Sequence, residues 1–123
     1  MLTFKDLQEE QIAWVKHNFP DRKPYFPLLG VMEELGELAH AHLKREQGIR
    51  GTVQEHEAAA KDAVGDIVIF LADYCTAQGF DFQEIMETTW KQVKQRDWKI
   101  DSLHGNSQTE EKSSKEETPP VVG

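Results

Sequence analysis

The hydrophobic positions of the chain follow a helical rather than a strand period, and proline and glycine divide them into segments. The first segment runs from about Thr3 to Phe19, and three closely spaced prolines after it predict a rigid connection. The second segment begins near Pro27 and continues to about Gln47. Gly48 follows it, shortly after two basic residues, as at a typical helix end. These features predict two helices joined by a stiff linker.

Two further helices are predicted from their capping patterns. The segment Thr52–Glu55 has the spacing of a capping box and opens a strongly apolar stretch that Gly79 ends. The segment Asp81–Glu84 repeats the pattern and opens a fourth helix that ends near Trp98. No stretch alternates apolar and polar residues with period two. We therefore predict an all-α fold built as a four-helix bundle.

The composition limits the size and the partners of this bundle. Residues 104–123 are rich in Ser, Thr, Glu, Lys and Pro and predict a disordered tail, which leaves residues 1–103 as one helical domain. A net charge of −8 argues against a general nucleic-acid-binding protein. The single cysteine, Cys75, excludes an intrachain disulfide, and the longest apolar run is far shorter than the roughly 20 residues of a membrane span. We expect a cytoplasmic protein without a membrane or nucleic-acid partner.

The second predicted helix carries three glutamates without a counter-ion. Glu34 and Glu37 share a face at i, i+3, and Glu33 and Glu37 share one at i, i+4. No lysine or arginine stands three or four residues from any of them. Like charges at this spacing destabilise a helix by a few tenths of a kcal/mol each, so another group must compensate for them.

The third predicted helix repeats this arrangement with Asp62 and Asp66, four residues apart on one face. Asp66 stands among the most apolar residues of the chain, where an ionised carboxylate without a partner costs several kcal/mol. Asp66 must therefore be protonated, pair with a cation such as Arg50 or Lys91 from elsewhere, or bind a metal ion. Two helices with unpaired acidic patches favour the metal, and carboxylate ligands suit Mg²⁺ or Mn²⁺. The alternative is a solvated acidic face.

Three segments resemble the MazG-like branch of the all-α NTP pyrophosphatase superfamily: EELGELAHAHLKREQGIRG, KDAVGDIVIFLADYC and GFDFQEIMETTWKQVKQRDW. The resemblance covers most of residues 28–99. That family carries Glu-Glu-x-x-Glu on one helix, which Glu33, Glu34 and Glu37 match, and Glu-x-x-Asp on the next. Its members are helical bundles that dimerise or tetramerise, bind Mg²⁺ and hydrolyse nucleoside triphosphates, often non-standard ones, to the monophosphate and pyrophosphate.

The resemblance also implies roles for individual residues. Asp66 matches the aspartate of the second motif, whereas Ala63 stands where the family has glutamate, and Asp62 is the natural substitute. Glu34, Glu37, Asp62 and Asp66 would bind the metal ion, and Glu33 would activate the attacking water. The alanine favours an alternative function, a non-catalytic helical module that kept the fold and binds a nucleotide or a partner.

Basic and aromatic residues outside the carboxylate cluster are candidates for substrate binding. Lys91, Lys94 and Arg96 could contact the triphosphate, although basic residues near a helix end also complement the helix dipole. Trp14 could stack on the base, although a tryptophan at helical spacing is more often in a core or a dimer interface. His40 completes a Glu-x-x-His spacing used by di-iron bundles, but those need two such motifs and the chain has one.

Overall fold

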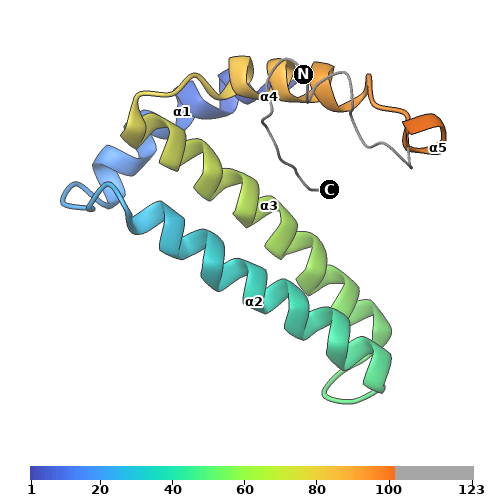
Figure 1. Ribbon diagram of the computed structural model, residues 1–123. Coiled ribbons are helices and arrows are strands. Elements are labelled where there is room, and N and C mark those ends of the chain that lie inside the picture. Colours follow the sequence, from blue (N-terminus) through green and yellow to red (C-terminus); the bar gives the residue numbers. More distant parts are fainter. Residues whose placement is uncertain (102–123) are drawn as a thin grey trace. The chain divides into compact units, whose positions relative to one another are not determined.

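A computed structural model, which describes residues 1–101, contains only helices within that part of the chain (Figure 1). The elements are α1 (Phe4–Asn18), α2 (Phe26–Gln47), α3 (Val53–Gln78), α4 (Phe82–Val93) and the short α5 (Trp98–Asp101). The all-α prediction is therefore confirmed for these residues. None of their helices combines the length and the apolar character needed to cross a bilayer. The predicted tail, 104–123, lies outside the described residues.

The helix ends form where the capping patterns predicted them. The Thr52 side chain accepts a hydrogen bond from the Glu55 backbone N–H at 3.0 Å, and the Glu55 carboxylate accepts one from the Thr52 N–H at 2.8 Å. This is the reciprocal capping box expected at the start of α3. Gly48 and Gly79 end α2 and α3 with φ of 71° and 76°, a left-handed conformation that costs glycine little.

The predicted end of the fourth helix was wrong. We expected it near Trp98, but α4 ends at Val93, and α5 begins only at Trp98. The Arg96 N–H bonds to the Val93 carbonyl at 3.1 Å, an i→i+3 bond that tightens the chain out of the α-helical path. Asp97 then accepts a hydrogen bond from the Lys99 N–H at 3.1 Å and starts a new turn.

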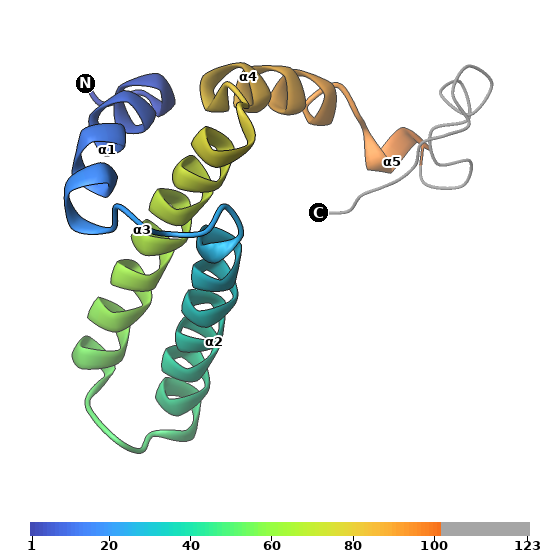
Figure 2. The ribbon, with the colours of Figure 1, turned by 90° about the vertical axis from the view of Figure 1, so that its left-hand side faces the viewer.

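The chain divides into two compact units, Met1–Met86 and Glu87–Gly123, with the boundary inside α4. In the first unit α2 and α3 form a long antiparallel hairpin, which Figure 2 shows side by side. The two helices approach closely at Gly30, where a Cβ atom would lie only 2.5–2.6 Å from the ring of Phe70. A glycine is therefore needed at this point of α2.

Helix α1 packs against the C-terminal half of α3 through a small apolar cluster and through hydrogen bonds of Gln8. Ala72, Cys75 and Phe82 are buried there, and Phe4 meets Phe82 edge to face at 5.0 Å between ring centroids. The amide of Gln8 accepts a hydrogen bond from the Phe82 N–H at 3.0 Å and donates one to the Phe80 carbonyl at 2.8 Å. These contacts fix α1 against the turn between α3 and α4.

Many large apolar side chains of the hairpin remain exposed. On α2 they recur at helical spacing and form one stripe, consisting of Leu28, Met32, Leu35 and Leu43. Val64 and Leu71 are exposed on α3 and are seven residues apart, which also places them on one face. Because Leu35 and Val64 each follow an acid of the cluster by two residues, about 200° around a helix, both stripes lie roughly opposite the acids.

Candidate functional site

The five predicted carboxylates occupy the middle of the hairpin on its two facing helices. Glu34 of α2 and Asp66 of α3 are half-buried between the helices. The other three, Glu33, Glu37 and Asp62, are exposed beside them. The hairpin thus brings together acids that the sequence separates by about 30 residues, as the prediction required.

Glu34 is close enough to the other carboxylates for their charges to affect its pKa. The pKa of Glu34 is raised above its ordinary value of 4.5, first because partial burial removes water from the charged form. Four negative charges raise it further, in the order Asp66, Glu37, Glu33 and Asp62. Glu34 therefore experiences all the other predicted acids, from its own helix and from α3.

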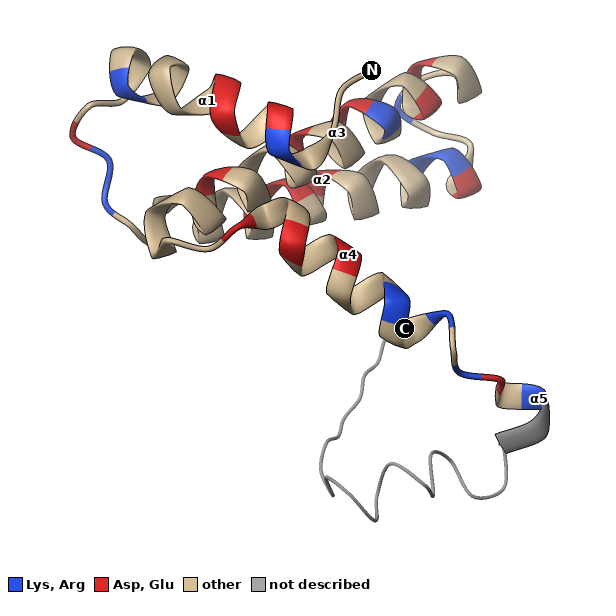
Figure 3. Ribbon diagram, turned by 90° about the horizontal axis from the view of Figure 1, so that it is seen from above, with Lys and Arg blue, Asp and Glu red and all other residues tan. Residues whose placement is uncertain are grey.

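No cation of the first unit compensates for these charges. The ion pairs formed by residues 1–86 are Arg22–Asp73, Arg45–Glu46 and Arg45–Glu57, and none includes a member of the cluster. Figure 3 shows acidic positions in the middle of α2 and basic ones at its C-terminal end. Arg50, one of the two partners considered for Asp66, does not pair with it.

The donor types in the cluster fit a hard divalent cation, since all are carboxylate oxygens. Within the part of the chain that the structure describes, however, no three His, Cys, Asp or Glu side chains converge closely enough to hold a metal ion. Mutual repulsion separates ionised carboxylates, and a bound dication would reverse the sign of that interaction. The assignment of Glu34, Glu37, Asp62 and Asp66 to a metal therefore stays a prediction.

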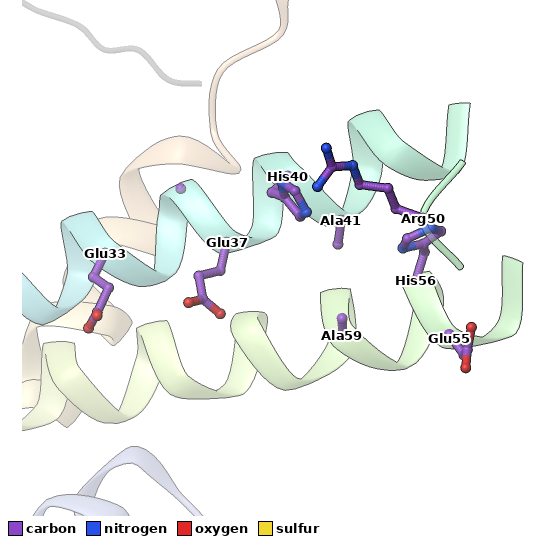
Figure 4. A pocket seen from close by; sticks show the side chains of 9 residues that line it. Glu33, Glu37, His40, Ala41, Arg50, Glu55, His56 and Ala59 are labelled. Atoms are coloured by element: carbon purple, nitrogen blue, oxygen red, sulfur yellow. The ribbon is translucent and has the colours of Figure 1, made fainter. Parts of the chain in front are cut away.

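A pocket of about 770 Å³ extends from the acids toward the turn between α2 and α3 (Figure 4). Glu33 and Glu37 extend from α2 toward α3 at one end of it. Arg50, His40 and His56 lie at the other end, and the guanidinium of Arg50 extends back toward His40. The carboxylates of the cluster thus lie at one end of the pocket and Arg50 lies at the other, where Glu55 also lines it, and the sequence indicated no function for Arg50 or His56.

Asp73, another acid of α3, was not predicted from the sequence. Asp73 is buried, and its carboxylate accepts hydrogen bonds from Arg22 Nε at 3.0 and 3.1 Å and from Arg22 Nη2 at 2.6 Å. This bidentate pair lies near the end of the hairpin opposite its turn. It borders an apolar pocket of about 480 Å³, which Phe26 and Phe70 also line. No local spacing could have indicated a pair of residues so far apart in sequence.

The remaining predicted site residues belong to α1 or to the second unit. Trp14 is 55% exposed on α1, where its ring meets Phe19 edge to face at 5.8 Å between centroids. Lys91, Lys94 and Arg96 belong to the second unit, in which the two lysines are exposed and the arginine is half-buried. Substrate binding by these four residues stays a prediction.

The departure from the family pattern has a structural counterpart. Ala63, at the position of the second motif's glutamate, is 2% exposed and packs inside the hairpin. Asp62, the proposed substitute, is exposed and contributes to the raised pKa of Glu34. The substitute is therefore on the accessible side of α3, near the other acids.

Comparison of the chain with protein-family models, with curated proteins and with solved structures found no match. The resemblance to the MazG-like family thus rests on its motif residues, Glu33, Glu34, Glu37 and Asp66.

Proposed function

We propose that this protein hydrolyses nucleoside triphosphates, non-standard ones among them, to the monophosphate and pyrophosphate in a Mg²⁺-dependent reaction. The observation that supports the proposal is the set of five carboxylates on facing helices, none of which forms an ion pair with a cation of residues 1–86. Partial burial and the charges of the other four raise the pKa of Glu34. The match of Glu33, Glu34 and Glu37 to the family's first motif also supports the proposal.

The carboxylates of the cluster have different proposed roles according to their positions. Glu34, Glu37 and Asp66 would bind Mg²⁺, and Asp62, shorter and more exposed, would bind it directly or through water. Mn²⁺ has the same ligand preference and would substitute. Bound Mg²⁺ supplies Lewis-acid stabilisation of the charge on the phosphate oxygens.

The reaction proceeds by attack of water on the α-phosphorus. Glu33, which lines the pocket from its exposed position on α2, accepts a proton from the attacking water. The water oxygen bonds to the α-phosphorus as the bond from that phosphorus to the bridging oxygen breaks. The electron pair of the broken bond leaves on pyrophosphate, and the nucleoside monophosphate remains.

Self-association belongs to the same proposal. The apolar stripe on α2 exposes Leu28, Met32, Leu35 and Leu43 on the side away from the acids, and few hydrophobic residues in the described part of the chain are fully buried. Covering such a stripe with a second copy would bury apolar surface at roughly 25 cal/mol per Å². We propose a homodimer or homotetramer formed through this face, which leaves the carboxylates accessible.

A non-catalytic helical module is the second candidate, and the burial of Ala63 at the motif position favours it. Such a module would bind nucleotides or a partner without releasing pyrophosphate. In a cytoplasmic setting, either protein would act on the free nucleotide pool rather than on a membrane or a nucleic acid.

A pyrophosphate-release assay separates the two candidates. The full chain is incubated with natural and modified deoxynucleoside triphosphates and Mg²⁺ or Mn²⁺. Release that falls at least about a hundredfold in Glu37→Gln and Asp66→Asn supports hydrolysis, since each variant removes one charged ligand. Arg45→Gln, outside the cluster, is the control and keeps its rate. A folded protein that releases nothing from any nucleotide is a binding module.

A further inference from the structure

The pocket beside the carboxylates ends at the turn between α2 and α3, where the backbone adopts positive φ angles. Gly51 has a φ of 140°, which a residue with a side chain rarely adopts, and a Cβ atom there would lie in tight contact, 3.0 Å from the Glu55 carboxylate oxygen. The buried His56 is hydrogen-bonded to this turn, with its Nε2 2.9 Å from the Ile49 carbonyl oxygen. A carbonyl can only accept, so Nε2 carries the proton.

This turn holds Arg50 in a conformation that arginine seldom adopts. Its φ of 64° makes it the one non-glycine residue with a positive φ among the described residues. The side chain leaves the turn over the pocket and extends toward His40 (Figure 4). The turn thus places Arg50 at the edge of the pocket, and its guanidinium extends from there toward His40.

Arg50 forms no ion pair with an acid of the first unit, although Glu55 lines the same end of the pocket. Glu55, which lines the same pocket, is engaged in the capping box with Thr52. The other arginines of the hairpin region, Arg22 and Arg45, both form ion pairs. An unpaired guanidinium with its five donors is suited to bind a phosphate in a bidentate manner.

We infer that Arg50, with His40 beside it, forms the subsite for the terminal diphosphate of the substrate, the part that leaves as pyrophosphate. The inference rests on the proposed function and adds the orientation of the substrate. Glu33 and His40 are seven residues apart, about 10 Å along α2, so the pocket continues well beyond the phosphoryl group under attack. The acids of the cluster repel a free phosphate and the Arg50 guanidinium attracts it, which sets the direction of the triphosphate.

The test is calorimetric binding of inorganic pyrophosphate and of a nucleoside monophosphate to the full chain with Mg²⁺ present. Arg50→Asn removes the charge, and asparagine tolerates a positive φ, so the turn is kept. We expect pyrophosphate to bind roughly 10-fold to 100-fold more weakly to this variant. Binding of the monophosphate should be unchanged. Arg50→Lys, which keeps the charge but loses the fork, should fall between the two.

Arg45→Gln is the matched control, because it removes an arginine from the same end of the hairpin that is already paired with Glu57. Pyrophosphate affinity that is unchanged in Arg50→Asn, or reduced equally in Arg45→Gln, overturns the inference even if the enzyme is active. So does a wild-type protein that binds no pyrophosphate. Pyrophosphate binding that needs Arg50 in a protein that hydrolyses no nucleotide keeps the subsite and refutes the proposed activity instead.

Discussion

Two aspartates of α3, seven residues apart, have opposite surroundings. Asp73 is buried near the end of the hairpin opposite its turn and is held by Arg22 through a bidentate pair. Asp66 is half-buried in the middle of the hairpin, near Glu34 and without any cation of the first unit. The chain therefore supplies an arginine where an acid serves the fold and omits one where the acids gather.

The packing of the two regions differs in the same sense. At the end opposite the turn, Gly30 and Phe70 are in such close contact that no side chain fits between them. Next to Asp66, Gly65 has nothing within 4 Å of the place where a Cβ atom would stand. The end near Asp73 is built for stability, whereas the acidic middle carries a repulsion that protonation or an added cation would relieve.

The largest expected effect is a difference in sign between two equivalent substitutions. Asp73→Asn leaves Arg22 with a neutral partner and should lower the free energy of unfolding by about 2–3 kcal/mol. Asp66→Asn removes a repulsive charge and should leave that free energy unchanged or raise it when Mg²⁺ is absent. Urea unfolding of both variants measures the difference. Equal destabilisation by the two would show that Asp66 has a stabilising partner.

Glycine substitutions test the packing difference at a smaller scale. Gly30→Ala should lower the free energy of unfolding by about 1–2 kcal/mol, because the new methyl group must displace the ring of Phe70. Gly65→Ala is its control in the open region and should raise the free energy by up to about 1 kcal/mol through helix propensity alone. Thermal and urea unfolding would give both values, and a stabilising Gly30→Ala would contradict the close contact.

The smallest effect is the pH dependence contributed by Glu34. Its folded-state pKa is raised above 4.5, so between the unfolded and folded pKa values the native state binds more protons. Stability should therefore fall as the pH rises through this window, and the loss should persist at neutral pH. Glu34→Gln should remove that part of the slope and be more stable than wild type at pH 7. An identical pH profile in the variant would mean that the acids do not interact.

Much of the fold could be predicted from local sequence signals. The capping box at Thr52 and the glycine stops at Gly48 and Gly79 act within one turn, and these helix ends formed where the sequence placed them. The end of α4 at Val93 was missed because Asp97 starts a new turn there, a competition that the apolar stripe does not reveal.

The site was predictable only as far as helical neighbours decide it. The absence of lysine and arginine around Glu34 and Asp66 is visible in the sequence, and it correctly indicated acids without local partners. The Arg22–Asp73 pair joins residues 51 positions apart, and the direction of Arg50 depends on a left-handed turn. Both follow from tertiary structure, which no spacing encodes.

Uptake of Mn²⁺, followed by electron paramagnetic resonance in the presence of a non-hydrolysable nucleoside triphosphate, shows directly whether the carboxylates of α2 and α3 bind a divalent cation. We expect saturable binding of Mn²⁺ to the wild-type chain and its displacement by Mg²⁺. Asp66→Asn and Glu37→Gln should abolish this binding, and Gly65→Ala should retain it. No saturable uptake by the wild type, or uptake that survives both acid substitutions, would contradict the proposed metal binding.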